Sequence, residues 1–184
     1  MTKLEQTAIH DESIEEDREH LINLLMDEHS DEILHLVFTY VNNQTTAEDL
    51  TQEIFIKCYE KLHQFNEQSS IKTWLFRIAI NHCKDYLKSW HYRKISLHEK
   101  IWDSLPSNTK QVDEELIAKT EEERLAHAVI ALPVKYREVI YLHYYQELSL
   151  VEISKVTAVN LNTIKTRMKR AKELVKDQII EEVE

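Results

Sequence analysis

The sequence predicts an all-α protein built from two small helical domains. The 184 residues include no glycine and only two prolines, Pro106 and Pro133, so few positions interrupt a helix. Apolar residues recur every three or four positions almost throughout the chain, which is the spacing of amphipathic helices. This pattern fades once, around Pro106. We therefore expect an acidic N-terminal segment over residues 1–14, a helical domain over 15–92, a flexible linker over 93–113 and a second helical domain over 114–184.

The first domain is expected to contain four helices, and the first two follow directly from the apolar pattern. One helix ends near Glu28, after Leu21, Leu24 and Leu25. Ser30 or Asp31 can cap the next helix, because short polar side chains accept hydrogen bonds from free amides at a helix start. That second helix should end at Asn42-Asn43. With no glycine available, left-handed turn positions should fall to asparagine, the next most tolerant residue.

Capping residues also predict where the third and fourth helices of this domain begin. Thr45 or Thr46 is expected to cap the third helix, and Glu48 stands three residues after Thr45 in the spacing of a capping box. A polar loop follows over residues 65–70. Ser70 should then cap the fourth helix, which carries apolar residues from Ile71 to Trp90.

The second domain ends in a pattern typical of a helix-turn-helix. A first apolar stripe stops at Pro133, which is favourable in the first turn of the following helix. Ser149 is expected to cap a short helix over residues 150–157. Asn160 or Asn162 should open the last helix.

Charge is unevenly distributed along the chain. The net charge of −10 argues by itself against nucleic-acid binding. However, residues 1–32 hold eleven acids against two bases, whereas residues 162–176 hold six bases against one acid and residues 71–100 hold seven bases against two acids. An acidic body with two basic faces suits a protein that contacts DNA at two places and another protein elsewhere.

Composition also excludes several classes of function. Without glycine there is no Gly-rich phosphate loop or dinucleotide-binding turn, and no nucleophile, base and orienting group can be named, so we expect a non-enzyme without cofactors. Ten histidines include no ligand set at a known spacing, so no metal is expected. No apolar run approaches eighteen residues and the acidic start does not resemble a signal peptide, which predicts a cytoplasmic protein without membrane insertion. Cys58 and Cys83 form no C-x-x-C pair and are expected to be reduced thiols.

The last helix separates apolar and basic residues in the way that a DNA-reading helix requires. Ile164, Met168 and Ala171 give it a buried stripe. A major groove admits one such helix, with base edges meeting its N-terminal half and phosphates meeting the flanking cations. A solvated basic face on an ordinary amphipathic helix would have the same composition. The candidate DNA contacts are Lys165, Thr166, Arg167, Lys169, Arg170 and Lys172.

These residues resemble a known family, the extracytoplasmic-function (ECF) sigma factors. The stretches that carry the resemblance to its region 4.2 are Ser149-Leu150-Val151-Glu152-Ile153-Ser154 and Asn162-Thr163-Ile164-Lys165-Thr166-Arg167-Met168-Lys169-Arg170-Ala171-Lys172, and residues 132–140 resemble region 4.1. The resemblance implies that the last helix reads the promoter −35 element. The residues implied as base or phosphate contacts are Lys165, Thr166, Lys169 and Arg170, and those implied as contacts of the DNA backbone are Arg167 and Lys172. The chain departs from the family in the turn, where Ala158 and Asn162 replace the usual glycines.

Two earlier stretches resemble region 2 of the same family. Ala47-Glu48-Asp49-Leu50-Thr51-Gln52-Glu53 resembles region 2.2, which docks on a coiled coil of the largest polymerase subunit, and implies contacts by Asp49, Gln52 and Glu53. Residues 65–81 resemble regions 2.3 and 2.4, which capture a flipped base of the melted −10 element. The residues implied there are Phe65, Asn66, Ser69, Trp74, Asn81 and Lys84. Aromatic surface, amides and cations suit an unstacked base, although Trp74 could also serve the core.

The resemblance covers both domains in the expected order and implies an alternative sigma factor. Such a protein binds core RNA polymerase and promoter DNA, and in this family an anti-sigma factor commonly holds it inactive. Two other hypotheses remain open at this stage. A stand-alone helix-turn-helix regulator would bind duplex DNA without polymerase, usually as a dimer. A helical adaptor with merely solvated basic faces would show no salt-dependent DNA binding. The separate docking and melting motifs before the linker argue against both.

Overall fold

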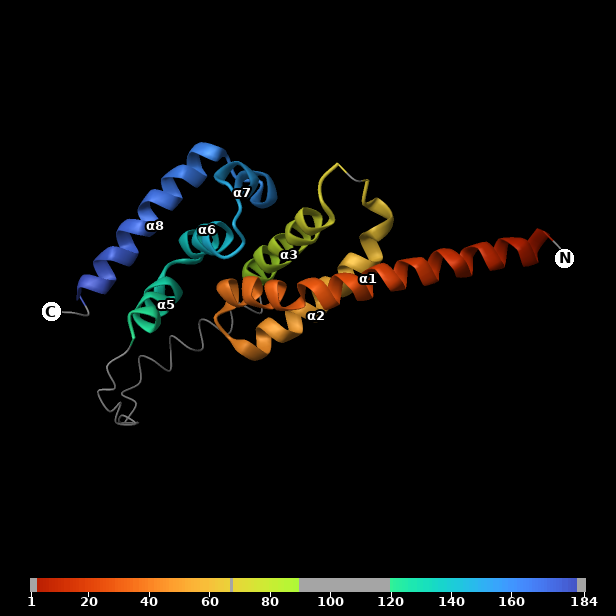
Figure 1. The fold of residues 1–184 in the computed structure, drawn as a ribbon, viewed down its shortest axis with the longest axis horizontal. Helices are drawn as coiled ribbons and strands as arrows, with labels where there is room; N and C mark the ends of the chain where they lie inside the picture. Colours follow the sequence, from red (N-terminus) through yellow and green to blue (C-terminus); the bar gives the residue numbers. More distant parts are fainter. Residues whose placement is uncertain (1–2, 67, 90–119, 182–184) are drawn as a thin grey trace. The chain divides into compact units, whose positions relative to one another are not determined.

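Helices make up all the regular structure in the described part of the chain. The computed structural model describes residues 3–66, 68–89 and 120–181. Every regular element in these ranges is helical, which confirms the predicted all-α fold class (Figure 1). The fold divides into two compact units, residues 1–82 and 83–184, so the division falls within α3 (Ile71–Lys88). The predicted linker over 93–113 lies outside the described residues.

The first unit begins with one long helix, α1 (Lys3–Val41), where two helices were expected. The predicted break at Ser30 and Asp31 is wrong. Neither glycine nor proline interrupts this stretch, and contacts with other helices hold α1 before Ser30 as well as after it. Before Ser30, Arg18 donates to the Tyr59 carbonyl of α2 at 3.0 Å. Glu32, one turn after His29, accepts from Lys72 of α3 at 2.8 Å, and its other oxygen lies 3.0 Å from His29 Nδ1.

The turn between α1 and α2 (Gln44–Lys61) is made by two asparagines. Asn42 adopts a left-handed conformation with φ of 50°, which confirms that asparagine takes this role here. Asn43 is the N-cap, and its side chain accepts from the Thr46 amide at 2.9 Å. The expected cap at Thr45 or Thr46 is therefore two or three residues too late. Glu48 instead accepts from the Gln44 side chain at 2.7 Å.

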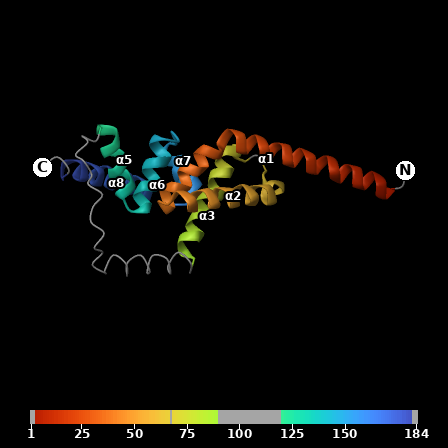
Figure 2. The same ribbon diagram turned by 90° about the horizontal axis from the view of Figure 1, so that it is seen from below.

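The core of the first unit lies between α1, α2 and α3. A short 3-10 helix, η1 (Leu62–Gln64), follows α2, and Ser70 caps α3 as predicted, because its hydroxyl accepts from the Thr73 amide at 3.2 Å. Figures 1 and 2 show α2 beside the C-terminal part of α1, while the N-terminal half of α1 runs on beyond it. The fully buried core side chains include Ile33, Leu36, Val37 and Tyr40 of α1, Ile54 and Cys58 of α2, and Leu75, Phe76 and Ile80 of α3.

The second unit contains α5 (Glu121–Ala131), α6 (Val134–Tyr144), α7 (Leu150–Thr157) and α8 (Leu161–Glu181). Thr120 and Glu123 form a capping box at the start of α5, and Pro133 is the N-cap of α6. The long helix α8 packs against α5, α6 and α7, so it closes one side of the core. That core includes Leu132, Val139, Leu142, Ile153 and Ile164.

Candidate functional site

The helix-turn-helix of the second unit has the predicted boundaries. Ser149 caps α7 in a capping box with Glu152, whose carboxylate accepts from the Ser149 amide at 2.8 Å. The turn passes through Ala158, which is left-handed with φ of 55° and ψ of 34°. Ser154 holds this turn, because its hydroxyl donates to the Val159 carbonyl at 2.6 Å. Asn160 then caps α8 by accepting from the Asn162 amide at 2.9 Å.

The left-handed position in this turn belongs to Ala158, and Asn162 lies inside α8. Glu147, before α7, is also left-handed with φ of 54°. Both positions depart from the expectation that asparagine would fill such turns. An L-residue in this conformation costs about 1–2 kcal/mol, so the chain carries strain on either side of α7.

The basic side chains of α8 are turned away from the core. Ile164, Met168 and Ala171 are buried, whereas Lys165 and Lys169 are exposed. Four of the six predicted DNA contacts line one shallow hollow of about 520 Å³. These four are Thr166, Arg167, Lys169 and Arg170.

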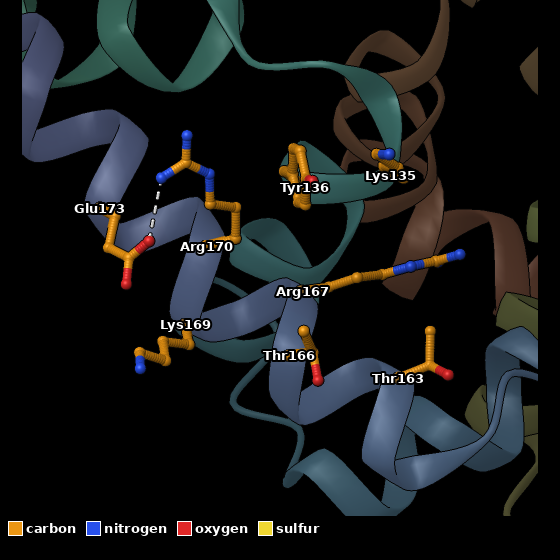
Figure 3. Close-up of a pocket in the computed structure, with 8 residues that line it drawn as sticks. All are labelled: Lys135, Tyr136, Thr163, Thr166, Arg167, Lys169, Arg170 and Glu173. Atoms are coloured by element: carbon orange, nitrogen blue, oxygen red, sulfur yellow. Dashed lines mark hydrogen bonds and ion pairs between the residues drawn. The ribbon is translucent and has the colours of Figure 1, made fainter.

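Two residues of α6 join this hollow, and sequence reasoning missed them. Lys135 and Tyr136 lie in the first turn of α6 and complete the lining with Thr163 and Glu173 of α8 (Figure 3). The Lys135 ammonium lies 4.9 Å from the Tyr136 ring centre. A cation beside an aromatic ring at a helix start, immediately after Pro133, is the local signal that could have identified them. We call the eight lining residues the basic hollow.

Ion pairs shape two members of the basic hollow. Arg170 Nη1 lies 3.0 Å from Glu173 Oε2, one turn along α8 (Figure 3). Arg167 is half-buried, and its Nη1 lies 3.5 Å from the carboxylate of Glu138, which is buried on α6. Arg167 therefore links α8 to α6, while Arg170 stands at the surface with a carboxylate beside it.

The remaining predicted contacts lie elsewhere on α8. Lys165 is exposed outside the basic hollow. Lys172 borders a separate apolar groove of about 510 Å³ between α5, α6 and α8, and its ammonium lies 5.5 Å from the Tyr144 ring. Leu125 and Ile180 are exposed in this groove, which the sequence analysis did not predict.

In the first unit, the loop before α3 packs one aromatic ring against another. The ring centres of Phe65 and Trp74 are 5.6 Å apart at an angle of 56°, and both side chains are half-buried. Asn66 and Ser69 are exposed on the same loop. Trp74 thus offers part of its ring to the core and part to the surface.

One stripe of α3 brings the other predicted residues into line with Trp74. Asn81 lies seven residues further on, about two helical turns, and is exposed. Lys84 follows one turn later and is half-buried. Arg77 is exposed between Trp74 and Asn81 on the same stripe, and sequence reasoning counted it only as a charge. The loop and this stripe together present aromatic, amide and cationic groups.

The predicted docking residues lie on the outer face of α2. Asp49, Gln52 and Glu53 are exposed, opposite the buried stripe of Leu50, Ile54 and Cys58 that faces the core. Ile56 is 59% exposed one turn beyond Gln52, so this face has an apolar centre that the sequence analysis missed. The run Ile54-Phe55-Ile56 carried the signal, because three consecutive residues of a helix cannot all face one core.

The described residues contain neither a metal-ligand cluster nor a membrane-spanning helix. Within residues 3–66, 68–89 and 120–181, no group of three or more histidine, cysteine or acidic side chains is arranged to hold a metal ion. None of the helices in that part of the chain is both long enough and apolar enough to cross a membrane.

Comparisons with known proteins match both units. The family model described as Sigma-70 region 2 matches residues 25–91, and that described as Sigma-70, region 4 matches residues 122–175. RNA polymerase sigma factor YlaC of Bacillus subtilis (strain 168) is 32% identical over 146 residues, which cover 77% of this chain and 82% of YlaC. ECF RNA polymerase sigma factor SigW of the same organism is 28% identical over 162 residues, covering 84% of this chain and 87% of SigW.

Solved structures share the fold at low sequence identity. The sigma factor RpoE from Bartonella quintana, in complex with the anti-sigma factor NepR, aligns with a TM-score of 0.63 and 20% identity over 85% of this chain and 95% of RpoE. CnrH, in complex with the cytosolic domain of CnrY, aligns with a TM-score of 0.60 and 19% identity over 86% of this chain and 87% of CnrH. Since both sigma-70 regions match in order and the alignments with YlaC and the ECF factor SigW cover most of the chain, the protein belongs to the sigma-70 family of RNA polymerase sigma factors, in its ECF group.

Proposed function

We propose that this sigma factor directs core RNA polymerase to promoters through three separate surfaces of its own chain. The observation that carries the proposal is the basic hollow on α8, which belongs to a helix-turn-helix and has its apolar side buried. The proposed domains are residues 15–92 for polymerase docking and −10 recognition and 114–184 for −35 recognition. Residues 93–113 would join them, and residues 1–14 form the acidic N-terminal segment.

The basic hollow is the proposed −35 reader. Thr166 and Lys169 are exposed on the N-terminal half of α8, the part that meets base edges when a helix enters a major groove. Arg170 would exchange its pairing with Glu173 for a base or phosphate. Lys135 and Tyr136 lie at the edge of the same hollow, where phosphate contacts fix the register of a helix without reading sequence. Lys165 and Lys172 remain proposed contacts of the same helix, further from this centre.

The loop before α3 and the exposed stripe of that helix are the proposed −10 reader. Phe65 and Trp74 supply aromatic surface for an unstacked base, and Asn81 supplies an amide that can pair with a base edge. Asn66, Ser69 and Lys84 are the other proposed contacts. Single-stranded DNA binds by stacking and by cations that follow its backbone, and this surface offers both.

The outer face of α2 is the proposed polymerase-docking surface, formed by Asp49, Gln52, Glu53 and Ile56. An apolar centre with acidic and amide neighbours suits a basic helical partner, because buried apolar contact supplies affinity and charge supplies orientation. Polymerase would carry out all of the chemistry, so we propose that this chain is not itself an enzyme. Acting on chromosomal promoters would place it in the cytoplasm.

We also propose that an anti-sigma factor controls this protein. The structures of RpoE with NepR and of CnrH with the cytosolic domain of CnrY support this proposal, because both relatives share the present fold. A partner of this kind would act by covering one or more of the three surfaces.

Run-off transcription with purified core RNA polymerase tests the proposed function. Wild-type protein should form a stable complex with core enzyme and yield promoter-specific transcripts. Arg170→Ala should reduce transcription that depends on the −35 element, and Asn81→Ala should alter −10 preference. Lys176→Ala is the matched control, because it removes an exposed cation from α8 outside the basic hollow.

Each alternative result has a definite meaning. Unchanged promoter preference in both variants would contradict the residue assignments. Duplex DNA binding without a polymerase complex would contradict the docking surface and favour a stand-alone regulator. For a phosphate contact such as Lys135, alanine substitution should weaken binding to all sequences and lower the salt dependence by about one unit of slope.

A further inference from the structure

One histidine of α3 stands between an acid and a base of α2. His82 is buried, with 9% of its side chain exposed. Its Nδ1 lies 2.6 Å from Lys57 Nζ, and its Nε2 lies 2.9 Å from Glu53 Oε2. All three residues belong to the first compact unit, residues 1–82.

The chemistry of the three groups sets the direction of these hydrogen bonds. A lysine ammonium can only donate, and an ionised carboxylate can only accept. Nδ1 of His82 therefore accepts from Lys57, which leaves the ring proton on Nε2, where it points at Glu53. A neutral imidazole in this tautomer satisfies both neighbours at once.

The spacing of Glu53 and Lys57 favours a different arrangement in the absence of His82. Glutamate four residues before lysine on one helix is the favourable orientation for a direct ion pair. Here the imidazole occupies the space between the two charges, and it draws the Lys57 ammonium towards α3. The Glu53 side chain remains 58% exposed on the outer face of α2.

We propose that His82 is a positioning residue of the polymerase-docking surface, because it keeps Lys57 from pairing with Glu53 and so leaves that carboxylate available to a basic partner. The inference rests on the proposed docking role of the outer face of α2. His82 itself lies beneath this face and acts through its contacts with Lys57 and Glu53. Without the imidazole, Lys57 would neutralise the carboxylate from its own helix, and the partner would lose a charge to pair with.

The test measures the dissociation constant of full-length variants for core RNA polymerase, with thermal unfolding recorded in parallel. His82→Ala should weaken binding by about three- to fivefold, the upper range for one partly exposed ion pair. Adding Lys57→Gln to His82→Ala should restore binding to within about twofold, because no cation then remains to neutralise Glu53. His82→Gln should also preserve binding, because its side-chain oxygen can accept from Lys57 while its NH2 group donates towards Glu53.

A matched control separates positioning from simple destabilisation. His29 is another buried histidine, 6% exposed, and it pairs with Glu32 of α1 away from the docking surface. His29→Ala should lower the unfolding temperature without weakening polymerase binding. Long-range proton–nitrogen NMR correlation on the free chain should place the His82 ring proton on Nε2.

Several results would overturn the inference while leaving the proposed function intact. These are wild-type affinity in His82→Ala, failure of Lys57→Gln to restore binding, or a His82 ring proton on Nδ1. If the wild-type chain itself does not bind core polymerase, the proposed function fails first and the inference fails with it.

Discussion

Replacing Ala158 by glycine should stabilise the helix-turn-helix. Ala158 ends α7 in the left-handed conformation, where its Cβ costs about 1–2 kcal/mol. Glycine would remove this cost but would lose more backbone freedom on folding, a penalty of about 0.5–1 kcal/mol. The midpoints of these two ranges leave a net gain of about 0.75 kcal/mol, so we expect a gain of about 0.5–1 kcal/mol. Ala158 is exposed, so the substitution leaves the core unchanged.

Hydrogen exchange measured by mass spectrometry on the full-length chain can detect this gain. Raising the free energy of local opening by about 0.5–1 kcal/mol corresponds to roughly twofold to fivefold slower amide exchange in α7. Ala126→Gly is the matched control, because Ala126 is also exposed but lies within α5, where glycine costs about 1 kcal/mol and should speed local exchange. Faster exchange in Ala158→Gly would refute the reasoning about strain, as would equal shifts in the same direction for both variants.

Three further predictions concern other elements. Ser149→Ala should destabilise α7 by about 1 kcal/mol. Hydrogen bonds from the Ser149 hydroxyl and amide lower the pKa of Glu152, so their stabilisation is present above the ordinary value of 4.5 and is lost as pH falls through the lower folded pKa. The difference in unfolding free energy between Ser149→Ala and wild type should therefore become smaller as the pH is lowered. Thermal unfolding at a series of pH values measures it, and a difference that grows at low pH would contradict this. Burial raises the pKa of Cys58 from 9.0 to about 12, so the native thiol should resist alkylation. The free energy of unfolding should fall as pH rises from 9.0 towards 12, because in this range only the unfolded chain loses the thiol proton. Equal alkylation rates with and without urea would contradict this burial. Phe65→Ala should reduce promoter opening, measured by permanganate reactivity, more than polymerase binding, because it removes the ring that packs on Trp74; an equal loss in both would argue for a structural role.

The local part of the fold could be predicted from sequence because its causes are local. Ser149 and Glu152 are three residues apart and satisfy each other's backbone and side-chain groups, so the start of α7 follows from a short stretch of sequence. Ser70 sets the start of α3 in the same way. The break expected at Ser30 was wrong because its cause is not local. Whether a serine begins a new helix or lies inside a longer one depends on contacts with residues far along the chain, such as the ion pair of Lys72 with Glu32.

The candidate sites also divide into features with local causes, which the sequence predicts, and features that depend on packing between helices. Periodicity identified the exposed basic residues of α8, because burial of Ile164 and Met168 leaves only one side of the helix for cations. It could not reveal that Lys135 and Tyr136 border the same hollow, since they reach it only through the packing of α6 on α8. Ile56 was missed for another reason: its signal was not periodicity but the run of three apolar residues from Ile54 to Ile56, which is one more than a single core face can bury.

Charge on the α2 surface shows why local rules are insufficient even where they are correct. The rule for residues four apart predicts that Lys57 neutralises Glu53, which would leave the docking surface less acidic. In the fold, an imidazole 25 residues further along the chain from Lys57 accepts a hydrogen bond from the lysine ammonium and donates one to the carboxylate. The electrostatic character of this face is therefore decided by the packing of α3 on α2. Substitutions of residues buried beneath α2 should therefore alter polymerase binding as strongly as substitutions on its surface. His82→Ala, alone and combined with Lys57→Gln, measures this effect.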